Sequence, residues 1–208
     1  MSTNLHTEFL PAPEPGSRRL MIVLHGLGDS MEGYRWWPEA MQLPWLNYLL
    51  VNAPDPYYSG FSWYDLENPA PGVERSRGLL FHLLEQLAVK NFPADQIVLS
   101  GFSQGCLMSI EIGARHRHRL AGIVGISGYV LDPEQLVKQL APEAVLQRFL
   151  ITHGTQDPLI PIGEVRPDIE ILKRAGLQIE WREFVKAHTI AGEDEMSVIR
   201  DFVKSRFA

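Results

Sequence analysis

The pentapeptide Gly-Phe-Ser-Gln-Gly at positions 101–105 constrains the fold of this chain most. It follows the apolar run Ile97–Leu99 after one residue, Ser100, and opens a stretch whose apolar residues have helical spacing. A serine in such a strand-to-helix turn has a strained backbone and tightly packed neighbours, so the flanking positions take glycine, which lacks a Cβ. The pattern therefore predicts a turn that holds the hydroxyl of Ser103 above one edge of a sheet.

Short apolar runs alternate along the chain with stretches of helical spacing. The runs predict strands at Leu20–Leu24, Tyr48–Val51, Ile97–Leu99, Ile123–Ile126, Phe149–Thr152 and, more weakly, Ile179–Val185. The helical stretches are Leu79–Leu87, Cys106–Arg115, Ile169–Ala175 and Met196–Phe207. Apolar strands separated by helices indicate an α/β fold with a mostly parallel central sheet and helices on both faces. With 208 residues, 45% of them apolar, we expect one domain spanning residues 1–208.

Composition and charge exclude several classes of function. The net charge is −6 and the basic residues are scattered, so we expect no nucleic-acid partner and favour small-molecule substrates. Cys106 is the one cysteine, so no intramolecular disulfide can form, and residues 1–20 lack a signal-peptide pattern. We therefore expect a cytoplasmic protein. No apolar run approaches the roughly 20 residues that span a bilayer, which excludes integral insertion and leaves peripheral membrane contact open.

The segment 53–72 is crowded with proline and aromatic residues and has no periodicity. It predicts a long loop, and its aromatic content argues against disorder, so we expect an active-site loop. Phe61 and Trp63 are candidates to line an apolar substrate groove. The alternative is that these aromatic side chains form a hydrophobic cluster that packs the loop against the domain.

A second apolar group comprises Trp36, Trp37, Met41 and Trp45. The sequence allows three roles for this group: core packing, contact with a membrane surface, and contact between two copies of the chain. The sequence accordingly leaves open whether the protein is a monomer or a homodimer.

Polar residues follow the predicted strands at their carboxyl ends, where ligand sites form in open α/β sheets. A serine nucleophile needs a base within hydrogen-bond reach and an acid that fixes the tautomer of that base. Enzymes with this type of turn carry the three in the order serine, acid, histidine. His188 follows the last apolar run and is the predicted base, because His153 precedes the candidate acid.

Two aspartates compete for the role of the acid. Asp157 follows the run Phe149–Thr152 through a turn at Gly154, which directs its carboxylate toward the sheet edge. Asp132 is followed directly by a proline, which is the pattern of a helix N-cap. The turn chemistry favours Asp157.

An oxyanion that develops on a substrate needs two backbone donors. The N–H of Gln104, directly after Ser103, stands at a predicted helix N-terminus, where the dipole favours negative charge. The second donor is expected in the loop after the first strand, and we assign it to the N–H of Leu27 because Gly26 and Gly28 flank it. The side chain of Leu27 is then free to border the substrate pocket.

Taken together, these motifs resemble the phospholipase/carboxylesterase family, which includes acyl-protein thioesterases and bacterial carboxylesterases. The matching segments are 25–29 (His-Gly-Leu-Gly-Asp), 62–65 (Ser-Trp-Tyr-Asp), 101–105, 153–157 (His-Gly-Thr-Gln-Asp) and His188. The resemblance covers the chain from about Arg19 to its end. It implies an α/β-hydrolase fold without a large cap and a Ser103–Asp157–His188 triad with oxyanion donors at Leu27 and Gln104. It also implies hydrolysis of esters or thioesters with medium or long acyl chains, chemistry that needs no cofactor and no metal ion.

The chain departs from this family at two positions. Cys106 and Ala187 stand where relatives usually carry glycine, after the elbow and before the histidine. Neither residue is a reacting group, so the departures bear on substrate range and on the position of His188.

Two other functions are compatible with the sequence. One is a non-catalytic, hydrolase-like protein that holds a lipid or a hydrophobic partner on its aromatic loop. The other keeps the chemistry and changes the substrate to a peptide or a lactone. Retention of every triad member favours the esterase.

Overall fold

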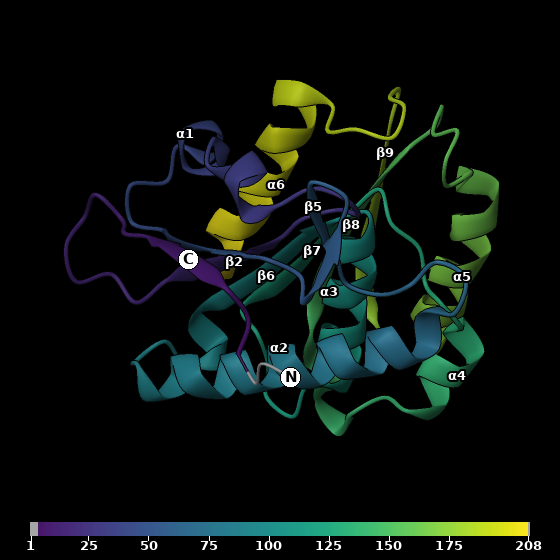
Figure 1. Cartoon of the computed structure of the whole chain (residues 1–208), viewed down its shortest axis with the longest axis horizontal. Helices are drawn as coiled ribbons and strands as arrows, with labels where there is room; N and C mark the ends of the chain where they lie inside the picture. Colours follow the sequence, from purple (N-terminus) through teal and green to yellow (C-terminus); the bar gives the residue numbers. More distant parts are fainter. Residues whose placement is uncertain (1–3, 208) are drawn as a thin grey trace.

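The computed structural model describes residues 4–207, which fold around a seven-stranded sheet (Figure 1). In sheet order the strands are β1 (Thr7–Leu10), β3 (Asn47–Val51), β2 (Leu20–Leu24), β6 (Ile97–Phe102), β7 (Gly122–Ile126), β8 (Arg148–Gly154) and β9 (Gln178–Phe184). Strand β1 pairs antiparallel with β3, and every other neighbouring pair is parallel. The prediction of a mostly parallel sheet is confirmed.

Helices cover both faces of the sheet, as predicted (Figure 1). One face carries α2 (Pro69–Val89), α3 (Gln104–Arg115), α4 (Pro133–Lys138) and α5 (Ile162–Arg174), and the other carries α1 (Trp37–Met41) and α6 (Gly192–Arg206). Short 3-10 turns occupy Met31–Tyr34, Ala94–Gln96 and Pro142–Leu146. Within residues 4–207 no large cap covers the carboxyl ends of the strands, and none of the helices is long and apolar enough to cross a bilayer.

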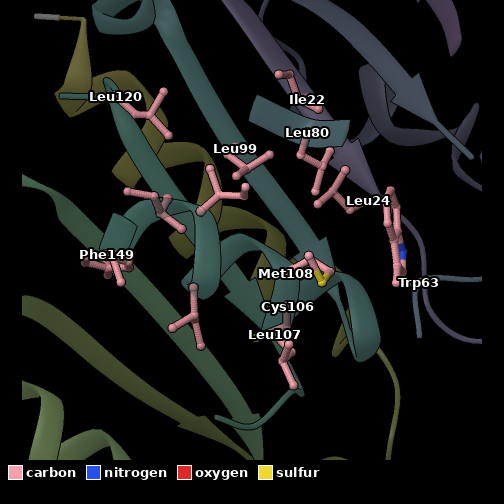
Figure 2. Packing of buried hydrophobic residues seen from close by; sticks show 14 of the residues in the cluster. Ile22, Leu24, Trp63, Leu80, Leu99, Cys106, Leu107, Met108, Leu120 and Phe149 are labelled. Atoms are coloured by element: carbon pink, nitrogen blue, oxygen red, sulfur yellow. The ribbon is translucent and has the colours of Figure 1, made fainter. Parts of the chain in front are cut away.

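The central strands are buried on both faces, which explains their uninterrupted apolar sequence. In β2, Ile22 and Leu24 join the hydrophobic cluster beneath α2 and α3, whereas Met21 and Val23 join the cluster beneath α1 and α6. Successive side chains of a strand point to opposite faces, and both faces of β2 are buried, so all of its residues are apolar. Figure 2 shows the first cluster, with Trp63 at the same end as Leu24.

The segment 53–72 is more ordered than the predicted loop. It contains a β-hairpin of β4 (Asp55–Tyr57) and β5 (Gly60–Ser62), and α2 already begins at Pro69. Proline is tolerated in the first turn of a helix, so the prolines at 69 and 71 mark the start of α2 and do not interrupt it. Strand β1 was also missed, because it is a short edge strand that is only half-buried.

The apolar group around Trp37 is mainly core. Trp37 and Met41 are fully buried beneath α6, and Trp45 packs against Phe207. Trp36 remains 42% exposed. Core packing is therefore the role of most of this group.

Candidate active site

Three predicted site residues lie together at the carboxyl edge of the sheet. The Nε2 atom of His188 lies 2.9 Å from Oγ of Ser103, and its Nδ1 atom lies 2.7 Å from Oδ2 of Asp157. Ser103 follows β6, Asp157 follows β8, and His188 lies between β9 and α6. Because the carboxyl ends of parallel strands share one edge, segments far apart in the sequence meet there.

The turn at Ser103 is strained, and two glycines permit it. Ser103 has φ 54° and ψ −114°, a conformation that residues with side chains rarely adopt. A Cβ on Gly101 would overlap the carbonyl oxygen of Gly105, and a Cβ on Gly105 would overlap that of Leu24. The two glycines therefore let α3 approach β6 and β2 closely, as the sequence pattern requires.

The carboxylate of Asp157 is oriented by its own turn. Its Oδ1 atom accepts hydrogen bonds from the N–H groups of Leu159 (3.0 Å) and Ile160 (2.9 Å), which leaves Oδ2 for His188. Burial alone would raise the pKa of this carboxyl, but the hydrogen bonds from Ile160 and His188 outweigh it and hold the pKa below its ordinary value. An ionised carboxylate only accepts, so Nδ1 of His188 carries the proton and Nε2 offers its lone pair to Ser103.

The competing residues have other partners. Asp132 caps α4, with its Oδ1 accepting from the N–H of Gln135 at 2.9 Å, as its sequence context indicates. His153 is fully buried, and its Nε2 lies 2.9 Å from the carbonyl oxygen of Ile160. Burial lowers the pKa of His153. This histidine thus holds the turn that carries Asp157.

The two predicted oxyanion donors border the same groove as Ser103. Neither the N–H of Leu27 nor that of Gln104 has a hydrogen-bond acceptor within the described chain. The N–H of Gly28 donates to the carbonyl of Phe61 at 2.9 Å, and the N–H of Phe61 donates to the carbonyl of Asp29 at the same distance. Strand β5 therefore fixes the loop around Leu27 and leaves that amide open.

A groove of about 770 Å³ surrounds Ser103. Its lining is largely apolar and includes Leu27, Tyr64, Leu66, Tyr129, Val130, Leu159, Ile160 and Val165. Leu27 lies where the sequence places it. Tyr64, Leu66 and Leu159 were missed, although each is close in sequence to a motif that was recognised. Within residues 4–207 no group of three or more potential metal ligands is clustered.

Two predicted lining residues lie elsewhere, and these assignments are corrected. Trp63 does not border the groove, because its ring packs in the core and its Nε1–H donates to the carbonyl of His25 at 2.9 Å. Phe61 lines a separate depression beside Asn52 and Arg75. Trp63 therefore belongs to a hydrophobic cluster that packs the segment against the domain, which was the alternative considered above. Phe61 contributes its backbone hydrogen bonds to the loop at 28–29.

The side chain of Gln104 has a role that sequence reasoning did not identify. Its Oε1 accepts from the N–H of Trp63 at 2.9 Å, and its Nε2 donates to the carbonyl of Tyr64 at 2.9 Å. This buried amide joins the start of α3 to the segment after the hairpin. Tyr64 thereby reaches the groove wall, where its hydroxyl lies 3.0 Å from that of Tyr129.

His25 is a structural residue beneath the loop at Leu27. Its Nε2 accepts from the N–H of Ala53 at 3.0 Å, so its Nδ1 carries the proton that faces the carbonyl of Gly26 at 2.6 Å. Burial lowers the pKa of this fully buried imidazole and keeps it neutral.

The two departures from the family pattern have different surroundings. Cys106 is fully buried in the core beside Gly125 and Gly128, and burial raises the pKa of its thiol to about 12. A thiol in this state is a packing group and not a nucleophile. Ala187 is exposed on the loop before His188.

Known proteins resemble this chain in sequence and in fold. The family model described as Phospholipase/Carboxylesterase matches residues 6–206. The chain is 31% identical over 163 residues to acyl-protein thioesterase 1 of Schizosaccharomyces pombe. This alignment covers 72% of this chain and 73% of that protein. It is 30% identical over 204 residues to the Yarrowia lipolytica protein of the same name, with 88% and 90% covered. The crystal structure of esterase PE8 matches at 25% identity with a TM-score of 0.86, covering 97% of this chain and 99% of that one.

The chain belongs to the phospholipase/carboxylesterase family and has the α/β-hydrolase fold. It is an enzyme that hydrolyses carboxylic ester or thioester bonds, as opposed to the non-catalytic binding protein that the sequence also allowed.

The elbow geometry predicts that Gly105→Ala is destabilising. The added methyl group would overlap the carbonyl oxygen of Leu24, and overpacking of this kind costs about 1–3 kcal/mol. The matched control is Gly78→Ala in the interior of α2, where a Cβ meets nothing within 4 Å and alanine should stabilise by roughly 0.5–1 kcal/mol. Urea unfolding of the three proteins measures both effects. Equal stability of the two variants would contradict the close approach at the elbow.

The environment of His25 predicts a pH dependence of stability. The folded pKa is depressed, so below about pH 6.5 the unfolded state binds the proton more readily and the folded state loses stability as pH falls. For His25→Asn, the difference in unfolding free energy between pH 7 and pH 5 should be smaller by up to about 2 kcal/mol. His82→Asn, at an exposed position on α2, is the control and should keep the parent difference. An unchanged difference in His25→Asn would contradict a neutral, buried imidazole.

Proposed function

We propose that this enzyme is a serine carboxylesterase that uses Ser103 as nucleophile, His188 as general base and Asp157 as the orienting acid. The single observation that carries this proposal is the continuous hydrogen-bond chain from Ser103 through His188 to Asp157, with distances of 2.9 and 2.7 Å. These distances are within the range that proton transfer requires. The strained backbone of Ser103 supports the same role, because strain of this kind concentrates at functional sites.

Acylation begins when Oγ of Ser103 attacks the carbonyl carbon of the substrate. The hydroxyl proton moves to Nε2 of His188, and Asp157 stabilises the imidazolium that forms. The negative charge on the former carbonyl oxygen is held by the N–H groups of Leu27 and Gln104. His188 then gives its proton to the departing alcohol or thiol, which leaves an acyl group on Ser103.

Deacylation repeats these steps with water. His188 removes a proton from a water molecule, whose oxygen attacks the acyl carbon, and the same two amides hold the new oxyanion. Collapse of the intermediate returns the proton to Ser103 and releases a carboxylic acid. The groups that contact the substrate in these steps, on Ser103, His188, Leu27 and Gln104, border the groove, and Asp157 acts through its hydrogen bond to His188.

The groove and the relatives together indicate the substrate class. Apolar side chains such as Leu27, Leu66 and Leu159 would cover the acyl chain of a small ester or thioester. The relatives in Schizosaccharomyces pombe and Yarrowia lipolytica are named acyl-protein thioesterases, which favours including thioesters. The family description names phospholipases, so we include lysophospholipids among the candidate substrates. We infer that the enzyme acts as one domain in the cytoplasm, consistent with a single free cysteine.

Substitution of the two competing aspartates tests the proposal. Asp157→Asn should lower kcat on p-nitrophenyl butyrate by about 10⁴-fold, because an amide no longer selects the tautomer of His188 that accepts the serine proton. Asp132→Asn should keep kcat within about twofold of the parent, because asparagine caps helices equally well. Ser103→Ala should abolish the turnover of the parent chain. A large loss in Asp132→Asn with near-parent activity in Asp157→Asn would refute the assignment.

A further inference from the structure

A buried ion pair flanks the proposed base and has no part in the steps above. Nζ of Lys186 lies 2.6 and 2.7 Å from the two carboxylate oxygens of Glu195. The exposed fractions of the two side chains are only 2% and 0%. Lys186 precedes His188 by two residues, and Glu195 lies in the first turn of α6.

The carboxylate of Glu195 reaches both sides of the segment that carries His188. Besides the ammonium group of Lys186, it accepts the N–H of Ala191 at 2.7 Å. The carbonyl oxygen of Lys186 accepts the N–H of Gln156 at 3.1 Å, directly before Asp157. The same few bonds therefore connect the segment 185–191, the turn of the acid and the start of α6.

Alternate residues of this segment are exposed. Val185 is 81% exposed, and Ala187 and Thr189 are exposed as well. Lys186 is the one fully buried residue of the described segment 185–191. The apolar contacts of the segment are few: the ring of His188 lies 5.0 Å from that of Phe102, and Ile190 packs against the core. The buried ion pair adds a directional contact directly beside His188.

Ion pairs of this kind are weak sources of stability, because removing two charges from water costs several kcal/mol per ion. Burial lowers the pKa of the Lys186 ammonium group, and the charge of Glu195 opposes that shift. Well-packed apolar residues often stabilise a protein as much as a buried pair does, but they do not fix one arrangement with the same directionality. The location of this pair therefore indicates that it fixes the position of neighbouring residues.

We propose that Lys186 and Glu195 are positioning residues for His188, which hold its imidazole between Ser103 and Asp157. This inference rests on the proposed role of His188 as general base. Both residues act through His188 and touch neither the substrate nor the reacting atoms. A misplacement of about 1 Å at a catalytic group can cost about 100-fold in rate, so loss of the pair should appear in kcat.

The test is a double-mutant cycle between Lys186→Met and His188→Ala, with kcat and KM measured on p-nitrophenyl acetate. In the parent background, Lys186→Met should lower kcat by about 10- to 100-fold with KM unchanged, because the groove residues do not move. In the His188→Ala background it should change the residual rate less than about twofold, because the group through which it acts is gone. Equal factors in both backgrounds would show a merely structural role and overturn the inference.

Two further variants keep the test decisive. Lys186→Met/Glu195→Gln leaves no unpaired buried charge and retains an acceptor for Ala191, so it enters the same cycle if Lys186→Met does not fold. Arg77→Met removes a partner of the buried Glu111, which also pairs with Arg115, and should affect both backgrounds equally. If His188→Ala itself keeps parent activity, the proposed function fails. If His188→Ala is impaired and the Lys186 variants keep parent kcat, only the positioning role fails.

Discussion

The close packing of α3 against β6 and β2 is the constraint on which the rest of this site depends. Gly101 and Gly105 allow the backbone of α3 to approach the backbones of β6 and β2, where a Cβ would overlap a carbonyl oxygen. Ser103 is thereby held in a strained conformation between the two elements. The same packing brings the first amides of α3 to the groove, so the nucleophile and an oxyanion donor come from one local geometry.

Buried polar groups then hold the surrounding loops to this centre. His25 bonds on both ring nitrogens, Gln104 uses both ends of its amide, and Asp157 uses both carboxylate oxygens. Each such bond adds only about 1 kcal/mol of net stability, but leaving a buried partner unsatisfied costs more. The loops are therefore restricted to one arrangement, and the pair of Lys186 and Glu195 extends this principle to the segment of His188.

Much of the fold could be predicted from the sequence, because the information is local. Uninterrupted apolar runs located five of the six parallel strands, and a weaker alternating run located β9. The order of Ser103, Asp157 and His188 at strand ends indicated that they would meet. That Tyr64 and not Trp63 borders the groove could not be predicted, since both side chains are buried and only tertiary contacts decide which of two neighbours lies at the groove wall. The pairing of Lys186 with Glu195 could not be predicted either, because Lys186 lies in an irregular segment without a periodic pattern.

The most direct measurement of the central claim is the crystal structure of the chain after reaction with a fluorophosphonate. The account predicts a phosphorus bonded to Oγ of Ser103, with the phosphonyl oxygen about 2.7–3.1 Å from the backbone nitrogens of both Leu27 and Gln104. His188 should remain beside Asp157. An adduct on another residue, or a phosphonyl oxygen directed away from both amides, would contradict it.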